Sequence, residues 1–123
     1  MLFRSAVLIA TNRADSVEML VHTEYNHREY YRYLNCGYRL PLSGGTDKMT
    51  SDVPVGIYRT YVYIPPDEPF TYDNWCKALR GGNTFLSAGP IIRFTVNGQP
   101  IGDTVKLSGN GGTVEVEIGR AHV

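Results

Sequence analysis

Apolar and polar side chains alternate along residues 16–22 (SVEMLVH). Val17, Met19 and Val21 fall on one side, and the residues between them fall on the other. Alternation with a period of two is typical of a β-strand that has one face against a core. The pattern therefore predicts a strand over residues 16–22.

A change to helical spacing follows in residues 26–35 (NHREYYRYLN). Asn26 is available as an N-cap, and Gly37 tolerates the left-handed conformation that ends many helices. The short apolar stretch 38–42 then leads into the glycine turn 43–47 (SGGTD). The order of strand, helix, strand and turn predicts a βαβ unit with two parallel strands.

The second half of the chain predicts one more helix and several strands. Residues 55–64 (VGIYRTYVYI) are rich in β-forming side chains and end at a proline pair. Thr71 is expected to cap a helix over residues 71–80, which two glycines terminate. From there on, short strands are predicted over the ranges 84–87, 91–96 and 103–107, separated by glycine-containing turns such as Asn97-Gly98.

Both ends of the chain match translated sequencing-adapter sequence. Residues 1–5 (MLFRS) are the translation of CTCTTCCGATCT after a start codon, and residues 117–123 (EIGRAHV) are the translation of GAGATCGGAAGAGCACACGTC. Such residues are set aside in fold reasoning, as a tag would be. We therefore expect residues 6–116 to form the fold, with Ile118 able to extend the last strand by accident.

The amino-acid composition and net charge limit the kinds of partner that we expect for this chain. The 123 residues are 42% hydrophobic and 20% charged, which is ordinary for one globular domain. Twelve basic and twelve acidic residues leave no net charge, so we expect no nucleic-acid and no membrane partner. No targeting or membrane segment is visible in the sequence, and localisation stays open. Cys36 and Cys76 lack CxxC spacing and are expected to be buried thiols.

The sharpest chemical feature is Asp47, which follows the second predicted strand, while His22 ends the first. Functional groups in α/β folds gather at the carboxyl ends of parallel strands, and divalent metals accept mixed nitrogen and oxygen ligands. Asp47 and His22 are therefore candidate metal ligands. The alternatives are a structural Asx turn or N-cap for Asp47 and a surface histidine for His22. His27 is more simply explained as a helix residue.

Other catalytic and binding motifs are absent from the sequence. It holds no HxH, HExxH or CxxC, no glycine-rich nucleotide-binding loop and no GxSxG. The tyrosine-rich residues 25–38, with interleaved arginines, permit a platform on which bases or sugars stack. An amphipathic helix, with tyrosines in the core and at its rim, explains them more simply. Any metal site within this chain is therefore partial.

The run EYYRYLNCGYRLP (29–41), followed by GGTDKM (44–49), resembles the CehA/McbA-type metallohydrolases of the PHP (polymerase and histidinol phosphatase) superfamily. Residues 75–85 (WCKALRGGNTF) and the segment from Gly89-Pro90 through Asn97-Gly98 to Gly102-Asp103 continue the resemblance in the same order. The similarity spans nearly all of residues 6–116.

The resemblance implies an α/β fold in which residues 6–82 form the last βα units of a distorted (β/α)7 barrel. Residues 83–116 would begin a β-sandwich-like C-terminal domain. It also implies divalent metals (zinc, manganese or iron) at the carboxyl ends of the strands, with Asp47 as a ligand. The superfamily motif is often Asp-x-His, whereas this chain has Asp47-Lys48-Met49. The upstream HxH motif and the middle-strand ligands would precede residue 6.

Two functions follow as hypotheses. In the first, the parent protein is a metal-dependent hydrolase that uses metal-activated water on ester-type bonds of a small molecule, such as carbamate or phosphate esters. The fragment alone is then expected to be inactive. In the second, the parent is a non-catalytic PHP-like scaffold whose β module binds polymers or proteins. The fold class does not identify the substrate.

Overall fold

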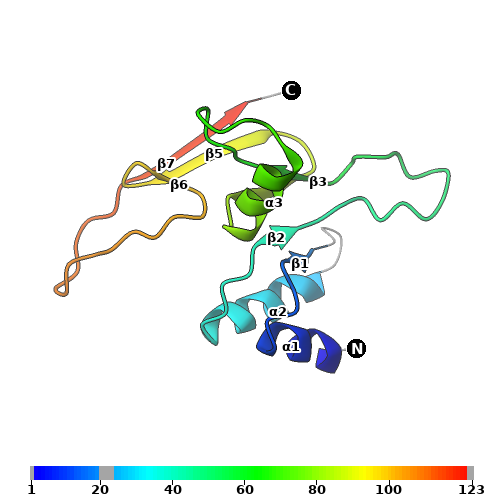
Figure 1. The fold of residues 1–123 in the computed structure, drawn as a ribbon, viewed down its shortest axis with the longest axis horizontal. Helices are drawn as coiled ribbons and strands as arrows, with labels where there is room; N and C mark the ends of the chain where they lie inside the picture. Colours follow the sequence, from blue (N-terminus) through cyan, green and yellow to red (C-terminus); the bar gives the residue numbers. More distant parts are fainter. Residues whose placement is uncertain (1, 20–23, 122–123) are drawn as a thin grey trace.

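The computed structural model describes residues 2–19 and 24–121. It has a mixed α/β fold with short helices and three small sheets (Figure 1). The elements in chain order are α1 (Leu2–Ala10), β1 (Val17–Glu18), α2 (Glu24–Asn35), β2 (Leu42–Ser43), β3 (Arg59–Val62), α3 (Tyr72–Arg80), β4 (Thr84–Ser87), β5 (Ile91–Val96), β6 (Gln99–Pro100) and β7 (Val116–Ala121). Within the described ranges the sheets contain two, two and three strands and do not close into a barrel.

The predicted βαβ unit is confirmed. Strands β1 and β2 pair in parallel, with Val17 opposite Leu42 and Glu18 opposite Ser43, and α2 connects them. The Met19 amide continues the ladder by donating to the Ser43 carbonyl at 2.8 Å. Both strands are shorter than predicted, and residues 20–23 of the first lie outside the described part of the chain.

Helix α2 begins at Glu24, two residues earlier than predicted. Asn26 therefore lies inside the helix, and its prediction as the N-cap is wrong. The predicted end is correct, because Gly37 adopts a left-handed φ of 86° and its amide donates to the Leu34 carbonyl. The Tyr30 hydroxyl donates to the Leu40 carbonyl at 2.8 Å and ties the helix to the chain that leads into β2.

Helix α3 confirms its predicted cap. Thr71 has extended backbone angles, and its hydroxyl oxygen accepts the Asn74 amide at 3.2 Å. The helix ends where predicted, at Gly81. None of the helices in the described ranges is long and apolar enough to span a lipid bilayer.

Strands β3 and β4 flank α3 in sequence and pair antiparallel over four residue pairs. The Tyr61 and Phe85 rings, which are opposite each other in this ladder, stack with centroids 4.9 Å apart. Strand β4 matches its prediction, but β3 begins only at Arg59. The prediction of a strand from residue 55 is wrong because residues 55–58 belong to a loop, where Val55 is 82% exposed.

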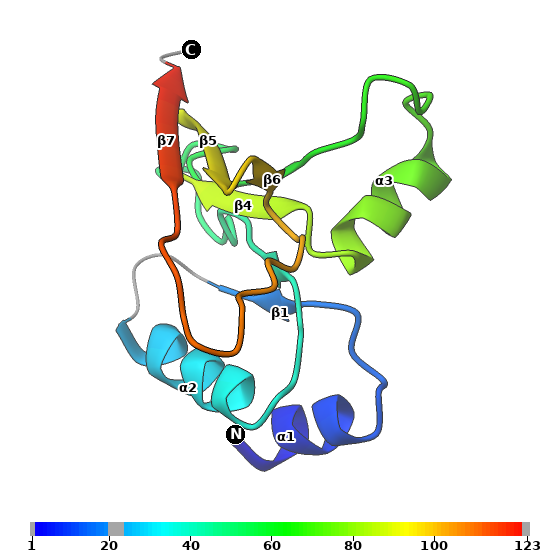
Figure 2. The ribbon, with the colours of Figure 1, turned by 90° about the vertical axis from the view of Figure 1, so that its left-hand side faces the viewer.

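A buried threonine joins the first two sheets. Thr84, 8% exposed on β4, donates its hydroxyl to the Leu42 carbonyl of β2 at 3.0 Å. This bond lies where two strands of different sheets come side by side (Figure 2). The Leu42 carbonyl lies on the side of β2 that has no strand partner, so the Thr84 hydroxyl supplies its hydrogen bond.

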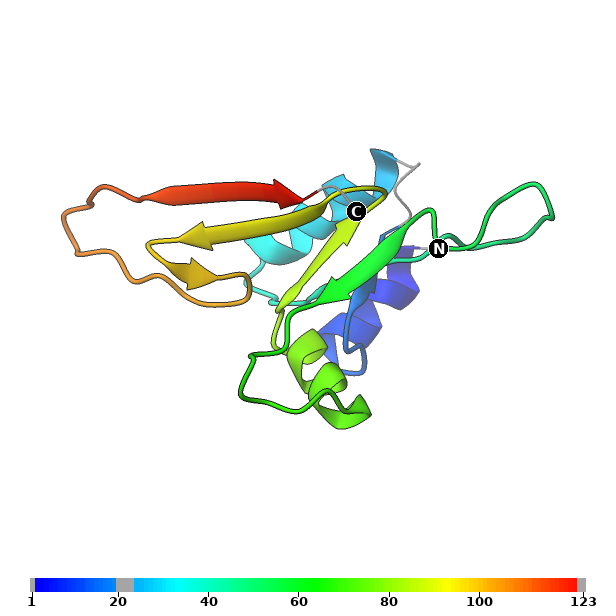
Figure 3. The same ribbon diagram turned by 90° about the horizontal axis from the view of Figure 1, so that it is seen from above.

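The third sheet has the order β6-β5-β7 and is antiparallel throughout (Figure 3). Asn97 and Gly98, with φ of 50° and 74°, form the predicted two-residue turn between β5 and β6. The predicted strand over residues 103–107 is wrong, since these residues are irregular. The long partner of β5 is β7, which pairs with it over six residue pairs.

The two ends of the chain both form secondary structure. Residues 2–5 belong to α1, and residues 117–121 make up most of β7. The tail forms a strand because its residues extend the ladder that Val116 begins against Val96, which places Ile118 opposite Phe94. Both adapter-like ends are thus part of the secondary structure.

Little of the molecule is buried. Among the described apolar side chains, only Ile9 (6% exposed) and Met19 (4%) count as buried. The chain exposes 9467 Å², whereas a compact monomer of this mass exposes about 6,600 Å². Several large apolar side chains are accordingly exposed, among them Met49, Val55, Phe70 and Ile118.

Candidate functional site

The candidate site is the loop of residues 44–58, which leaves β2 and extends away from the sheets before β3 (Figure 1). Its first residue is packed tightly against the βαβ unit. A Cβ on Gly44 would lie 2.6 Å from the Met19 carbonyl oxygen and 3.3 Å from a methyl carbon of Leu86. A Cβ on Gly45 would meet nothing within 4 Å. The first glycine of the pair is therefore required by a close backbone approach, and the second is not.

Two threonines close the base of this loop. The Thr60 hydroxyl donates to the Gly44 carbonyl at 2.6 Å and accepts the Gly44 amide at 2.8 Å. The Thr46 hydroxyl oxygen accepts the amides of Gly56 (3.1 Å) and Tyr58 (3.3 Å). These bonds hold the outgoing and returning arms together, so the base of the loop is fixed although neither arm is a strand.

The tip of the loop is held by Lys48. Its ammonium group donates to the carbonyls of Thr50, at 2.6 Å, and Val53. Asp52, at the same tip, has a pKa below its ordinary value because the Thr50 hydroxyl and its own backbone amide hydrogen-bond to the carboxylate. The charged groups of Lys48 and Asp52 are thus both hydrogen-bonded within the loop tip.

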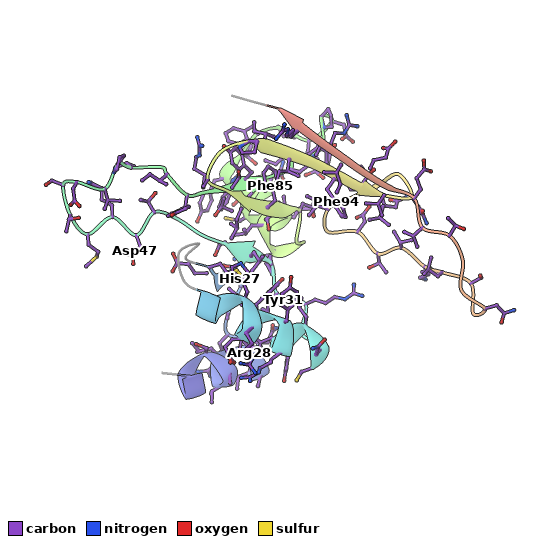
Figure 4. The ribbon with its side chains drawn as sticks, turned by 180° about the vertical axis from the view of Figure 1, so that it is seen from behind. His27, Arg28, Tyr31, Asp47, Phe85 and Phe94 are labelled. Atoms are coloured by element: carbon purple, nitrogen blue, oxygen red, sulfur yellow. The ribbon has the colours of Figure 1, made fainter. Side chains whose placement is uncertain are left out.

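Asp47 is exposed and has a left-handed φ of 48°. Within residues 2–19 and 24–121, no hydrogen bond or ion pair to its carboxylate is found, so the structure gives no support to an Asx turn or an N-cap there. Aspartate is one of the few residues that adopt this backbone conformation readily. Asp47 is therefore exposed on the protruding loop, four residues beyond the end of β2 at Ser43 (Figure 4).

The other candidate ligand, His22, lies outside the described residues. The parallel pairing of β1 and β2 nevertheless makes both strands end at the same edge of their sheet. His27 is described, is exposed, and lies on α2 (Figure 4). Neither histidine is therefore placed next to Asp47 by the described coordinates.

A metal ion would need more ligands than this loop provides. The described residues contain no group of three or more His, Cys, Asp or Glu side chains that could hold a metal ion. By itself, this part of the chain does not fit a complete divalent-metal site, because catalytic sites use about three protein ligands per metal. Asp47 contributes one oxygen-bearing side chain.

The cysteines differ from their prediction. Cys36 is exposed and Cys76 is half-buried, and both are free thiols. Cys36 is exposed because it follows the last turn of α2, on the way to Gly37. The prediction of a buried thiol is thus wrong for Cys36.

Sequence reasoning also missed a polar row on α3. Tyr72 has a raised pKa, chiefly because of its hydrogen bond with the Cys76 thiol. One turn further along the helix, Arg80 Nε donates to Asp15 Oδ1 at 3.0 Å. The spacing of residues 72, 76 and 80 is the signal that predicts such a row. Tyr72 and Arg80 in this row are exposed, and Cys76 between them is half-buried.

Comparison with known proteins adds no relative. No protein-family model matches the sequence, and neither a curated protein nor a solved structure matches it.

Proposed function

We propose that this chain is the C-terminal part of a metal-dependent hydrolase of the PHP type, in which Asp47 supplies one metal ligand. The observation that carries the proposal is the parallel β1-α2-β2 unit followed by Asp47, whose carboxylate has no partner among the described residues and lies on the loop that leaves the carboxyl end of β2. This edge is where α/β enzymes gather their functional groups.

The construction of the loop supports this assignment. Gly44 fits only because it lacks a side chain, and Thr60 and Thr46 fix the two arms behind Asp47. A carboxylate on a fixed backbone needs less ordering to bind a cation than one on a free loop. The substrate class is a small-molecule ester, with carbamate and phosphate esters as the first choices.

The finer fold belongs to the same proposal. Residues 6–82 would complete the last βα units of a distorted (β/α)7 barrel, and residues 83–116 would begin the β-sandwich-like domain. The parallel β1–β2 pair precedes the antiparallel sheets, as this order requires, although β3 of the first segment pairs with β4 of the second. The remaining ligands would come from outside the described residues.

The alternative is a non-catalytic PHP-like scaffold that binds polymers or proteins through its β module. One observation favours it: Met49, which stands where the family motif often has a histidine, is 83% exposed and offers no ligand for a hard cation. An intact upstream HxH motif in the full-length gene would decide for the hydrolase, and its loss would decide for the scaffold.

The test is hydrolysis of a chromogenic ester panel by the full-length parent. Asp47→Ala is expected to reduce turnover by about 100-fold or more, as loss of a metal-site group does. Asp52→Ala is the matched control, because Asp52 lies in the same loop with a carboxylate bonded within the loop. Equal turnover in the Asp47→Ala and Asp52→Ala variants would overturn the assignment.

A further inference from the structure

The outer edge of β7 is open to strand addition. In the sheet order β6-β5-β7, this strand pairs on one side with β5 and has no strand on its other side among the described residues (Figure 3). Val116 and Ile118 on it are 53% and 73% exposed. Unpaired strand edges with apolar side chains recruit another strand.

We propose that β7 pairs antiparallel with β7 of a second copy of this chain, around a two-fold axis at Ile118. A two-fold axis normal to an antiparallel ladder must pass between a residue and its own symmetry mate. Centring the axis on Glu117 or Arg120 would place like charges opposite each other. The two remaining choices in the middle of the strand are Ile118 and Gly119.

Charge complementarity selects Ile118. In that register, Glu117 of one copy lies opposite Gly119 of the other, and Gly119 lies opposite Arg93 of its own β5. Directly paired residues share a face of the sheet, so Arg93 and Glu117 of the second copy lie on one face with only a glycine between them. Gly119 has no side chain to block the approach. The two-fold axis generates this ion pair twice.

The side chains of Arg93 and Glu117 are both available for the proposed ion pair. Arg93 is exposed and makes no ion pair with any described residue. The Glu117 carboxylate is exposed and, among residues 2–19 and 24–121, accepts a hydrogen bond only from the Thr95 hydroxyl, at 3.2 Å. On the opposite face, Ile118 lies beside Phe94, and the dimer would add a second Ile118 to this apolar pair. The face with Arg93 and Glu117 is thus complementary in charge, while on the other face Val116 of one copy lies opposite Arg120 of its partner.

The edge of β7 favours a second copy over other occupants because the strand is complementary to itself in this one register. The large exposed area of the chain agrees with a missing partner. The proposal goes beyond the hydrolase function and does not depend on it, since no metal or substrate enters the argument. It concerns the chain in its present form, in which residues 117–123 match translated adapter sequence.

Cysteine cross-linking of the full chain tests the register. In a Cys36→Ser, Cys76→Ser background, the single variant Ile118→Cys places two thiols on directly opposed residues. Their Cα atoms would be about 4.5–5.5 Å apart, within the range of a disulfide. The matched control Val116→Cys places its thiols four residues out of register, about 14 Å apart. Mild oxidation is expected to cross-link the first variant and not the second.

Sedimentation of charge variants tests the ion pairs. Arg93→Glu and Glu117→Arg are each expected to weaken the dimer, about tenfold in dissociation constant, because each creates two like-charge contacts. The double variant restores opposite charges and is expected to return to within about threefold of the parent chain. Circular dichroism of each variant shows whether it has kept the fold.

Three results would overturn the proposal. The first is a monomeric mass for the parent chain at concentrations of about 100 μM, where β-edge dimers of modest affinity form. The second is equal cross-linking at positions 116 and 118. The third is a double charge variant no tighter than the single ones.

Discussion

Replacing Gly44 with alanine tests the packing that positions the candidate loop. The new Cβ would lie 2.6 Å from the Met19 carbonyl oxygen, a distance that real Cβ atoms do not adopt. Met19 is 4% exposed, and its amide donates to the Ser43 carbonyl. The Met19 backbone therefore cannot move away from the new Cβ without disturbing the β1–β2 ladder. Either the β1–β2 ladder or the loop must shift.

The matched control is Gly45→Ala, whose Cβ meets nothing within 4 Å. Both substitutions reduce the entropy of the unfolded chain equally, by about 0.4–1 kcal/mol, so this effect cancels in the comparison. The difference in unfolding free energy between them is the cost of the clash, about 1–3 kcal/mol as in other overpacked sites.

Urea unfolding followed by the fluorescence of Trp75, the single tryptophan, measures this difference. We expect Gly44→Ala to be the less stable variant, with Gly45→Ala equal to the parent chain or slightly more stable. If the two variants agree within about 0.5 kcal/mol, the close approach of Gly44 to Met19 is refuted.

Three further predictions follow from single contacts. Thr60→Val removes both hydrogen bonds to Gly44 and is expected to cost about 1–3 kcal/mol in urea unfolding, whereas an unchanged midpoint would contradict the role of Thr60. Thr71→Ala removes the cap of α3 and is expected to cost about 1 kcal/mol, with Thr71→Asn retaining most of the stability. Burial raises the pKa of Tyr30 above its ordinary value of 10.0, so its stabilising contribution is present below that pH and is lost as the pH rises through the raised value. Tyr30→Phe should therefore lose less stability than the parent chain as the pH rises above 10.0, and parallel losses would contradict this.

Local signals in the sequence predicted much of the fold. Thr71 with its hydroxyl cap, the glycine at position 37 and the Asn97-Gly98 turn each act within a few residues, so their structural effect is visible in the sequence. Strand partners are different. Residue 118 pairs with residue 94 across the long irregular segment after β6, and no local pattern indicates that pairing. The ends had been set aside for their match to adapter sequence, and this non-local pairing is why β7 was missed.

The candidate site was predictable only in part. That Asp47 follows a strand end could be deduced from the glycine turn before it, and the structure agrees. Gly44 must be glycine because of Met19 and Leu86, which are distant from it in sequence. The sequence around Gly44 therefore could not predict this requirement. The partners of Lys48 in the loop tip were hidden in the same way. A ligand set depends on non-local contacts of this kind.

The most direct test of Asp47 as a metal ligand is the equilibrium metal content of the full-length parent, measured by elemental analysis after dialysis against a weak chelator. The variants are Asp47→Asn, which keeps the shape of the side chain and removes its charge, and Asp52→Asn as the control from the same loop. We predict that the Asp47 variant holds at least one metal equivalent less per chain than the parent, while the Asp52 variant is unchanged. Equal metal content in the parent protein and both variants would contradict the proposed role of Asp47.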